Sequence, residues 1–140
     1  MTRANRTVPR DERGQSVSLL AMIVMAALIL TAGLVVDGGQ KLDASVRAEA
    51  AAAGAARAAG NAAATQELAG QESAGAAVLA AKAYLAGEPG VIGHVTVDSG
   101  VVRVRAESSA ATLFLSVIGL DHVSGTGSAE SDIIPIGPHR

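Results

Sequence analysis

The sequence predicts an α+β protein, in which an N-terminal transmembrane helix continues into a long alanine-rich helix, followed by a small antiparallel β-sheet with a short helix. Three observations predict this class. The twenty residues from Val17 to Val36 carry no charge, the next stretch is dominated by alanine, and the chain beyond Gly90 alternates β-branched and polar residues. A chain of 140 residues is long enough for one small domain and an anchor, but not for two sizeable cores.

The same observations divide the chain into five parts. Residues 1–15 are a polar cytoplasmic tail, 16–37 the transmembrane helix, 38–87 an alanine-rich extracytoplasmic helix, 88–135 a small β-rich domain and 136–140 a loose tail. Hydrophobic residues make up 49% of the chain but aromatic residues only 1%. Because alanine favours helix but buries little area, we expect the part outside the membrane to gain little stability from burial.

The apolar run reads VSLLAMIVMAALILTAGLVV. A helix of this length spans roughly 30 Å, the thickness of the hydrocarbon core of a bilayer. Four arginines precede the run, whereas the basic residues after it are mixed with acidic ones. This bias predicts a protein of the inner or plasma membrane, with a cytoplasmic N-terminus and an extracytoplasmic C-terminal domain. The lipid bilayer is therefore an expected partner.

A cleaved secretory signal peptide is the alternative interpretation of this run. Its apolar region would be about 7 to 15 residues long, with a small-residue cleavage site close behind it. Here the run is longer, and the nearest such site, Ala48-Glu49-Ala50, lies well beyond it and past charged residues. An anchor is favoured, and a secreted small binding domain that begins after Ala50 is the alternative.

The outer end of the predicted span carries Asp37, Gly38 and Gly39. Two adjacent glycines weaken a helix interior, so we expect a bend or a frayed joint there. The simpler interpretation of Asp37 is an interfacial charge in water. The alternative is a membrane-boundary contact with a partner subunit, since a carboxylate at this depth often pairs.

The chain is helix-like from Gln40 to about Leu85. Thirteen of the residues from Ala44 to Ala64 are alanine, and Asn61 is a candidate break before a second helical stretch. Small residues recur at a spacing of four at Ala50, Gly54 and Ala58, a pattern typical of faces on which another helix packs closely.

Glycine and proline between residues 87 and 90 end the helical pattern, and β-type alternation follows. Val91–Val97 and Val101–Ala106 flank a short loop that contains glycine, which predicts a hairpin. We expect a short helix from Ser108 or Ser109 to about Ile118, and a last strand from His122 to about Ile134.

The sequence contains no pattern that predicts catalysis, a cofactor or a metal site. There is no cysteine, the three histidines lack partners at helical spacing, and no HExxH, P-loop or GxSxG motif occurs. Gly125-Thr126-Gly127 lacks the lysine and following helix of a phosphate loop. Arg103 and Arg105 share the face of a strand predicted to meet solvent, with an anion site as the less favoured alternative. No basic stripe supports nucleic-acid binding. We expect a protein that is not an enzyme.

The order of several features resembles one family. Arg13-Gly14-Gln15 leads directly into the apolar run, which ends in Val36-Asp37-Gly38-Gly39-Gln40 and is followed by an alanine-rich helix that carries Arg47. From about Asp11 to Gly60 this resembles TadE/TadG-like proteins of the Flp (tight-adherence) pilus-assembly system, especially the actinobacterial forms. The resemblance implies a pilin-like fold and a non-enzymatic single-pass membrane component of pilus assembly or a related secretion apparatus, either pseudopilin-like or minor-pilin-like. Other pilus-assembly membrane proteins would be its partners.

The resemblance also implies a further partner, a prepilin peptidase, which would cut between Gly14 and Gln15. In pilin-like members a glutamate stands five residues after the cut, and here that position is Leu19. This departure favours the TadG-like form, in which the span stays as an uncleaved anchor.

Overall fold

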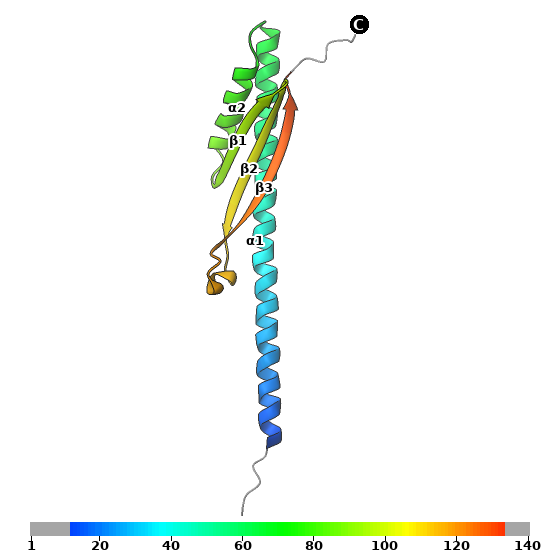
Figure 1. The fold of residues 1–140 in the computed structure, drawn as a ribbon, viewed down its shortest axis with the longest axis vertical. Helices are drawn as coiled ribbons and strands as arrows, with labels where there is room; N and C mark the ends of the chain where they lie inside the picture. Colours follow the sequence, from blue (N-terminus) through cyan, green and yellow to red (C-terminus); the bar gives the residue numbers. More distant parts are fainter. Residues whose placement is uncertain (1–11, 134–140) are drawn as a thin grey trace, which may run out of the picture.

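A computed structural model describes residues 12–133 of the chain (Figure 1). It contains two helices, α1 (Glu12–Leu68) and α2 (Ala74–Ala86), and three strands, β1 (Val91–Asp98), β2 (Val101–Ala111) and β3 (His122–Asp132). A single 3-10 turn, η1 (Leu115–Ile118), lies between β2 and β3. The predicted C-terminal tail and most of the predicted N-terminal tail lie outside the described residues.

Helix α1 is one continuous helix of 57 residues. The bend expected at Gly38 and Gly39 is wrong, because the helix runs through both glycines without interruption. The break expected at Asn61 is also misplaced. The chain turns after Leu68 instead, where Gly70 has a positive φ of 69° that favours glycine. The predicted extracytoplasmic helix 38–87 is therefore the second half of α1 together with α2.

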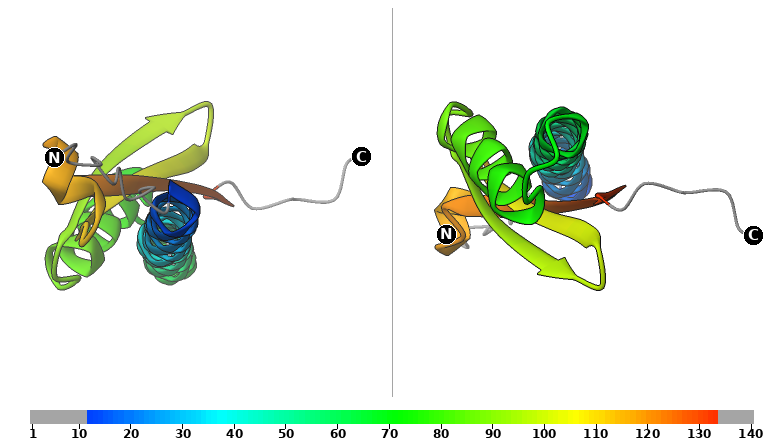
Figure 2. Two further views of the ribbon diagram at one scale, coloured as in Figure 1. Left: turned by 90° about the horizontal axis from the view of Figure 1, so that it is seen from below. Right: turned by 90° about the horizontal axis from the view of Figure 1, so that it is seen from above.

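The three strands form one antiparallel sheet in the order β1-β2-β3. Both helices lie on the same face of this sheet, and α1 projects far beyond it (Figures 1 and 2). The predicted hairpin is confirmed, with Val97 opposite Val102. The helix expected to begin at Ser108 or Ser109 is wrong, because β2 continues to Ala111 and pairs Ser108 with Gly125 of β3. Only the four residues of η1 are helical there.

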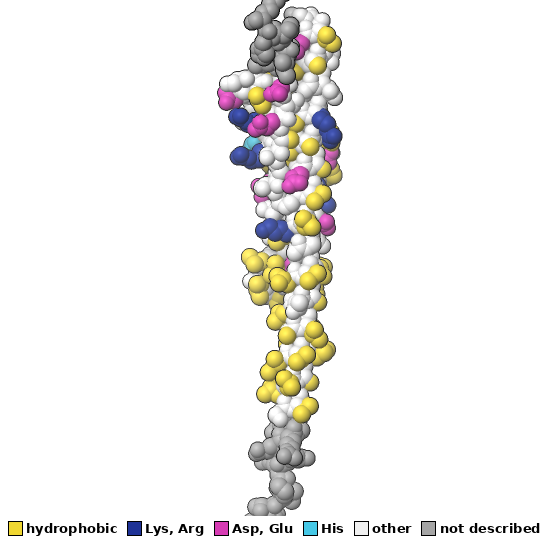
Figure 3. Space-filling view, turned by 90° about the vertical axis from the view of Figure 1, so that its right-hand side faces the viewer, with side chains coloured by type: hydrophobic (Ala, Val, Ile, Leu, Met, Phe, Trp, Pro, Cys, Tyr) yellow, Lys and Arg dark blue, Asp and Glu magenta, His cyan; other side chains and the backbone are white. Residues whose placement is uncertain are grey.

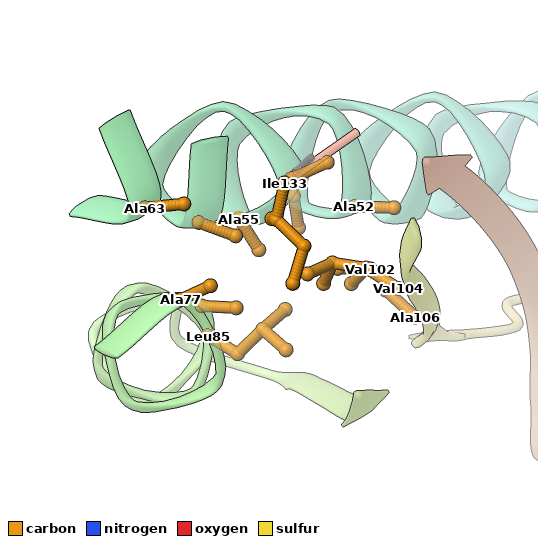
Figure 4. Packing of buried hydrophobic residues seen from close by; sticks show 13 residues of the cluster. Ala52, Ala55, Ala63, Ala77, Leu85, Val102, Val104, Ala106 and Ile133 are labelled. Carbon is orange, nitrogen blue, oxygen red and sulfur yellow. The ribbon is translucent and has the colours of Figure 1, made fainter. Parts of the chain in front are cut away.

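The core between helices and sheet is built mostly from alanine (Figure 4). Alanines of α1 and α2 meet a few larger side chains from the sheet and from α2, chiefly Leu85, Val102, Val104 and Ile133. Side chains this small fill the space only when the backbones approach closely. Glycine at Gly125 and Gly127 of β3 permits that approach, since a Cβ at either position would collide with the backbone of α1 at Ser45 or Glu49.

The predicted fold class is confirmed. A long apolar N-terminal helix packs along half its length against a three-stranded antiparallel sheet with a short helix, which is a pilin-like α+β arrangement (Figure 1). The sheet and α2 lie beside the alanine-rich half of α1, and the apolar half extends beyond them.

Candidate functional site

The apolar half of α1 is almost uncovered by the rest of the described chain, with Phe114 over Gly33 as its one noted contact. Every large hydrophobic side chain from Val17 to Val36 is at least 40% exposed, and only 6% of the most apolar stretch of the helix is buried by the rest of the chain. A core helix of a water-soluble protein would be mostly buried. This segment is long and apolar enough to cross a membrane, and its position near the N-terminus also fits a signal sequence.

The C-terminal end of this segment is joined to the sheet domain through Asp37. Its side chain is only 1% exposed, although it lies on a helix surface. Its Oδ1 accepts a hydrogen bond from the backbone N–H of Leu113 at 2.8 Å. Its Oδ2 accepts hydrogen bonds from the N–H groups of Phe114 at 3.0 Å and Leu115 at 2.6 Å. One carboxylate therefore satisfies three consecutive backbone donors at the start of η1, as a capping residue does for a helix N-terminus.

The segment between β2 and β3 is held against α1 at a second point. The ring of Phe114 lies over Gly33, where an added Cβ would come within 2.7 Å of the ring. Thr112 closes the segment upon itself, because its hydroxyl donates to the carbonyl of Leu120 and its N–H donates to the carbonyl of Asp121 at 3.0 Å. Gly119 ends η1 with a left-handed φ of 86°.

The geometry changes the interpretation of Asp37. The expectation of a charge in water is wrong, because the carboxylate is buried. The carboxylate is bonded within the chain, by the backbone of residues 113–115, and the alternative contact with a partner subunit stays a prediction. The sequence contains no local signal for this pairing, since the two segments are 76 to 78 residues apart.

The two residues at the predicted peptidase site, Gly14 and Gln15, lie in the first turn of α1, next to the exposed apolar stretch. Leu19, the position at which a pilin-like chain would carry glutamate, is 60% exposed on that stretch. The structure thus places all three at the end of the molecule opposite the sheet domain (Figure 1).

The outer face of the sheet carries the polar side chains. Arg103 and Arg105 are exposed there, as predicted, and the Nε of Arg103 lies 2.8 Å from Oε1 of Glu130. The less favoured anion site gains no support, because Arg103 is already paired with Glu130 and lies 3.6 Å from Asp98. Across residues 12–133, no three His, Asp or Glu side chains are grouped so that they could hold a metal ion.

One residue of the predicted contact face on α1, Gly54, packs against another helix of the same chain. Gly54 is buried beneath the ring of Tyr84 from α2, so that α1 and α2 approach closely at this point. Ala50 is exposed and Ala58 is half-buried. Close helix packing is thus found at Gly54 alone of the three positions, and its partner there is α2 of the same chain.

Comparison of the chain with protein-family models, with curated proteins and with solved structures finds no match.

Proposed function

We propose that this chain is a non-enzymatic single-pass membrane component of Flp/Tad-type pilus assembly or of a related secretion apparatus, pseudopilin-like or minor-pilin-like. The observation that carries the proposal is the division of one continuous helix into two halves. The half from Val17 to Val36 is apolar and its large side chains are all exposed, whereas the half from Ala44 to Ala63 packs beneath a small antiparallel sheet. The order of sequence features from Asp11 to Gly60 supports the same family.

The alternative, a secreted domain that begins after Ala50, has a structural cost. Cleavage there would remove Asp37, Ala44 and Ala48, which are all buried by the sheet domain or by the segment before β3. It would also remove the α1 residues that lie nearest to Gly125 and Gly127, which are Ser45, Ala48 and Glu49. A signal peptide is normally dispensable to the fold that it precedes. In this chain the helix that bears the apolar run is also the main support of the sheet.

The anchor has no charged group within it. A carboxylate in an apolar helix is costly unless it is paired, and the exposed Leu19 avoids that cost. Because Leu19 stands where a pilin-like chain carries glutamate, the chain lacks the charge by which such a subunit could pair with a neighbour in a filament. We therefore propose that the chain keeps residues 1–14 and acts beside a filament, rather than as its main subunit.

The test is deletion of the gene in its host cell, followed by counting of surface filaments by electron microscopy. We expect filaments to be lost or strongly reduced, and to return when the full chain is supplied. The matched control is a chain in which a signal-peptidase site is placed before Val36, so that the sheet domain is secreted without its anchor. This control should not restore filaments. An unchanged filament count in the deletion strain would contradict the proposal.

A further inference from the structure

The segment before β3 presents a cluster of exposed apolar side chains, which we call the foot: Leu113, Phe114, Val117, Ile118 and Leu120. Their exposed fractions run from 42% for Phe114 to 86% for Val117. No charged residue occurs between Thr112 and Leu120. Apolar side chains exposed together in this way, on a chain whose core is mostly alanine, mark a surface that meets something other than water.

The foot lies at the level where the apolar half of α1 ends. Phe114 rests on Gly33, which is inside the predicted span, and Asp37 just beyond it bonds to the foot. In the space-filling view, the foot forms an apolar bulge on the side of α1, and the charged side chains lie mostly above it (Figure 3). The apolar surface of the foot is thus continuous with that of the span.

Many of the polar groups of the foot form hydrogen bonds within the chain. Asp37 accepts from the N–H groups of residues 113–115, and the N–H groups of Val117, Gly119 and Leu120 donate to carbonyls of the same segment. The hydroxyls of Thr112 and Ser116 donate to the carbonyls of Leu120 and Leu113. Backbone groups that enter hydrocarbon must be bonded internally, because lipid offers no donor or acceptor. A protein partner could instead supply donors and acceptors of its own.

We propose that the foot inserts into the outer leaflet of the bilayer that α1 crosses, as a second membrane contact of the sheet domain. The inference rests on the proposed membrane anchor, and adds that the domain does not stand free above the surface. Two contacts on one rigid unit, the span and the foot, fix the rotation of α1 about its axis and hold the sheet at a set height above the lipid.

The test uses the full chain in phosphatidylcholine vesicles, with or without bromine on the acyl chains. The protein has no tryptophan, so each introduced tryptophan is a unique reporter. Ile118→Trp probes the foot and Leu28→Trp probes the span. Ile92→Trp on β1 is the matched control, since Ile92 and Ile118 are both 71% exposed. We expect brominated lipid to quench Ile118→Trp about as strongly as Leu28→Trp, and to leave Ile92→Trp unquenched.

Aqueous iodide separates the other outcomes. If iodide quenches Ile118→Trp as it quenches Ile92→Trp, while Leu28→Trp remains in lipid, the anchor stands and the inserted foot is wrong. If neither bromine nor iodide quenches Ile118→Trp, a second copy of the chain covers the foot, and the inference is again wrong. If Leu28→Trp is also quenched by iodide, the anchor itself fails. Val117→Trp repeats the test should Ile118→Trp fail to fold.

Discussion

At the scale of single residues, the fold depends on small or polar side chains that contact distant segments. Asp37 holds three backbone donors of the segment before β3, and Gly127 lets β3 approach the backbone of α1. Neither role resembles ordinary hydrophobic burial. Both act by allowing backbone to lie close to a helix, which is how a chain with two aromatic residues builds a packed domain.

Replacement of Asp37 should loosen the segment before β3. Asp37→Leu leaves the N–H groups of Leu113, Phe114 and Leu115 without an acceptor, and Asp37→Asn keeps one acceptor oxygen. We expect amide exchange at these three positions to rise by about tenfold or more in Asp37→Leu, and less in Asp37→Asn, since a bond to a charged acceptor shifts local opening by that order. Hydrogen–deuterium exchange on the full chain in micelles measures this. Asp43→Asn, at an exposed position, is the control, and unchanged exchange in Asp37→Leu would refute the role.

Replacement of two glycines of the chain by alanine should change the stability of the protein in opposite directions. A Cβ at Gly127 collides with the backbone of α1 near Glu49, so Gly127→Ala should destabilise the domain by about 1–3 kcal/mol. A Cβ at Gly39 meets nothing within 4 Å, so Gly39→Ala should stabilise the helix by about 0.5–1 kcal/mol. Calorimetry of the full chain in detergent gives both values. Equal effects from the two substitutions would show that the close approach of β3 to α1 does not limit packing.

At the scale of elements, the existence of the three strands was predictable, but the end of β2 and the ends of the helices were not. Alternation in Val91–Val97 and Val101–Ala106 fixed the hairpin, because period-two patterns report directly on a half-buried strand. The uninterrupted passage of α1 through Gly38 and Gly39 was not predictable from helix propensity. On either side of these glycines, Gly33, Asp37 and Ala44 are covered by the sheet or by the segment before β3. These contacts join segments that are distant in the sequence, so helix propensity does not report them.

The same limit applies to the candidate site. The apolar span was read from composition alone, whereas the pairing of Asp37 with residues 113–115 depends on the tertiary fold. Gly125-Thr126-Gly127 lies inside the predicted last strand, and the sequence alone did not indicate that its two glycines form the face that α1 approaches. Ser108 and Ser109 resembled helix caps because serine caps helices well, and strand pairing with β3 overrode that local preference.

Contact between α1 and α2 should depend on the fit of Tyr84 over Gly54. Gly54→Ala places a methyl group against the Tyr84 ring and should cost about 1–3 kcal/mol. In a Tyr84→Ala background the clash is absent, so the same change should cost little. A double-mutant cycle of thermal unfolding measures this coupling. An equal cost of Gly54→Ala in both backgrounds would mean that Tyr84 does not limit the approach of the two helices.

At the scale of the whole molecule, one helix has two halves with different surfaces. Its first half is exposed and apolar, and its second half supports the sheet, so a rigid connection links the proposed anchor to the domain (Figure 1). The proposed function requires the apolar half to lie within the bilayer and the second half to lie outside it. The arginines before the span place the domain outside the cell membrane under this proposal.

Orientation can be tested by cysteine labelling, because the chain has no cysteine of its own. Thr96→Cys lies on the exposed face of the sheet, and Thr2→Cys lies in the N-terminal tail. A maleimide that cannot cross membranes should label Thr96→Cys in intact spheroplasts, and Thr2→Cys only after lysis. The reverse pattern would show that the orientation inferred from the arginines is wrong.

The central claim is that the apolar half of α1 remains attached to the domain as its membrane anchor. The most direct measurement is the intact mass of the protein recovered from the membrane and soluble fractions of its host cells. We predict the full chain, Met1 to Arg140, in the membrane fraction. Loss of residues 1–14 would keep the anchor but show that Gly14 is a cleavage site. A soluble species that begins after Ala50 would contradict the account.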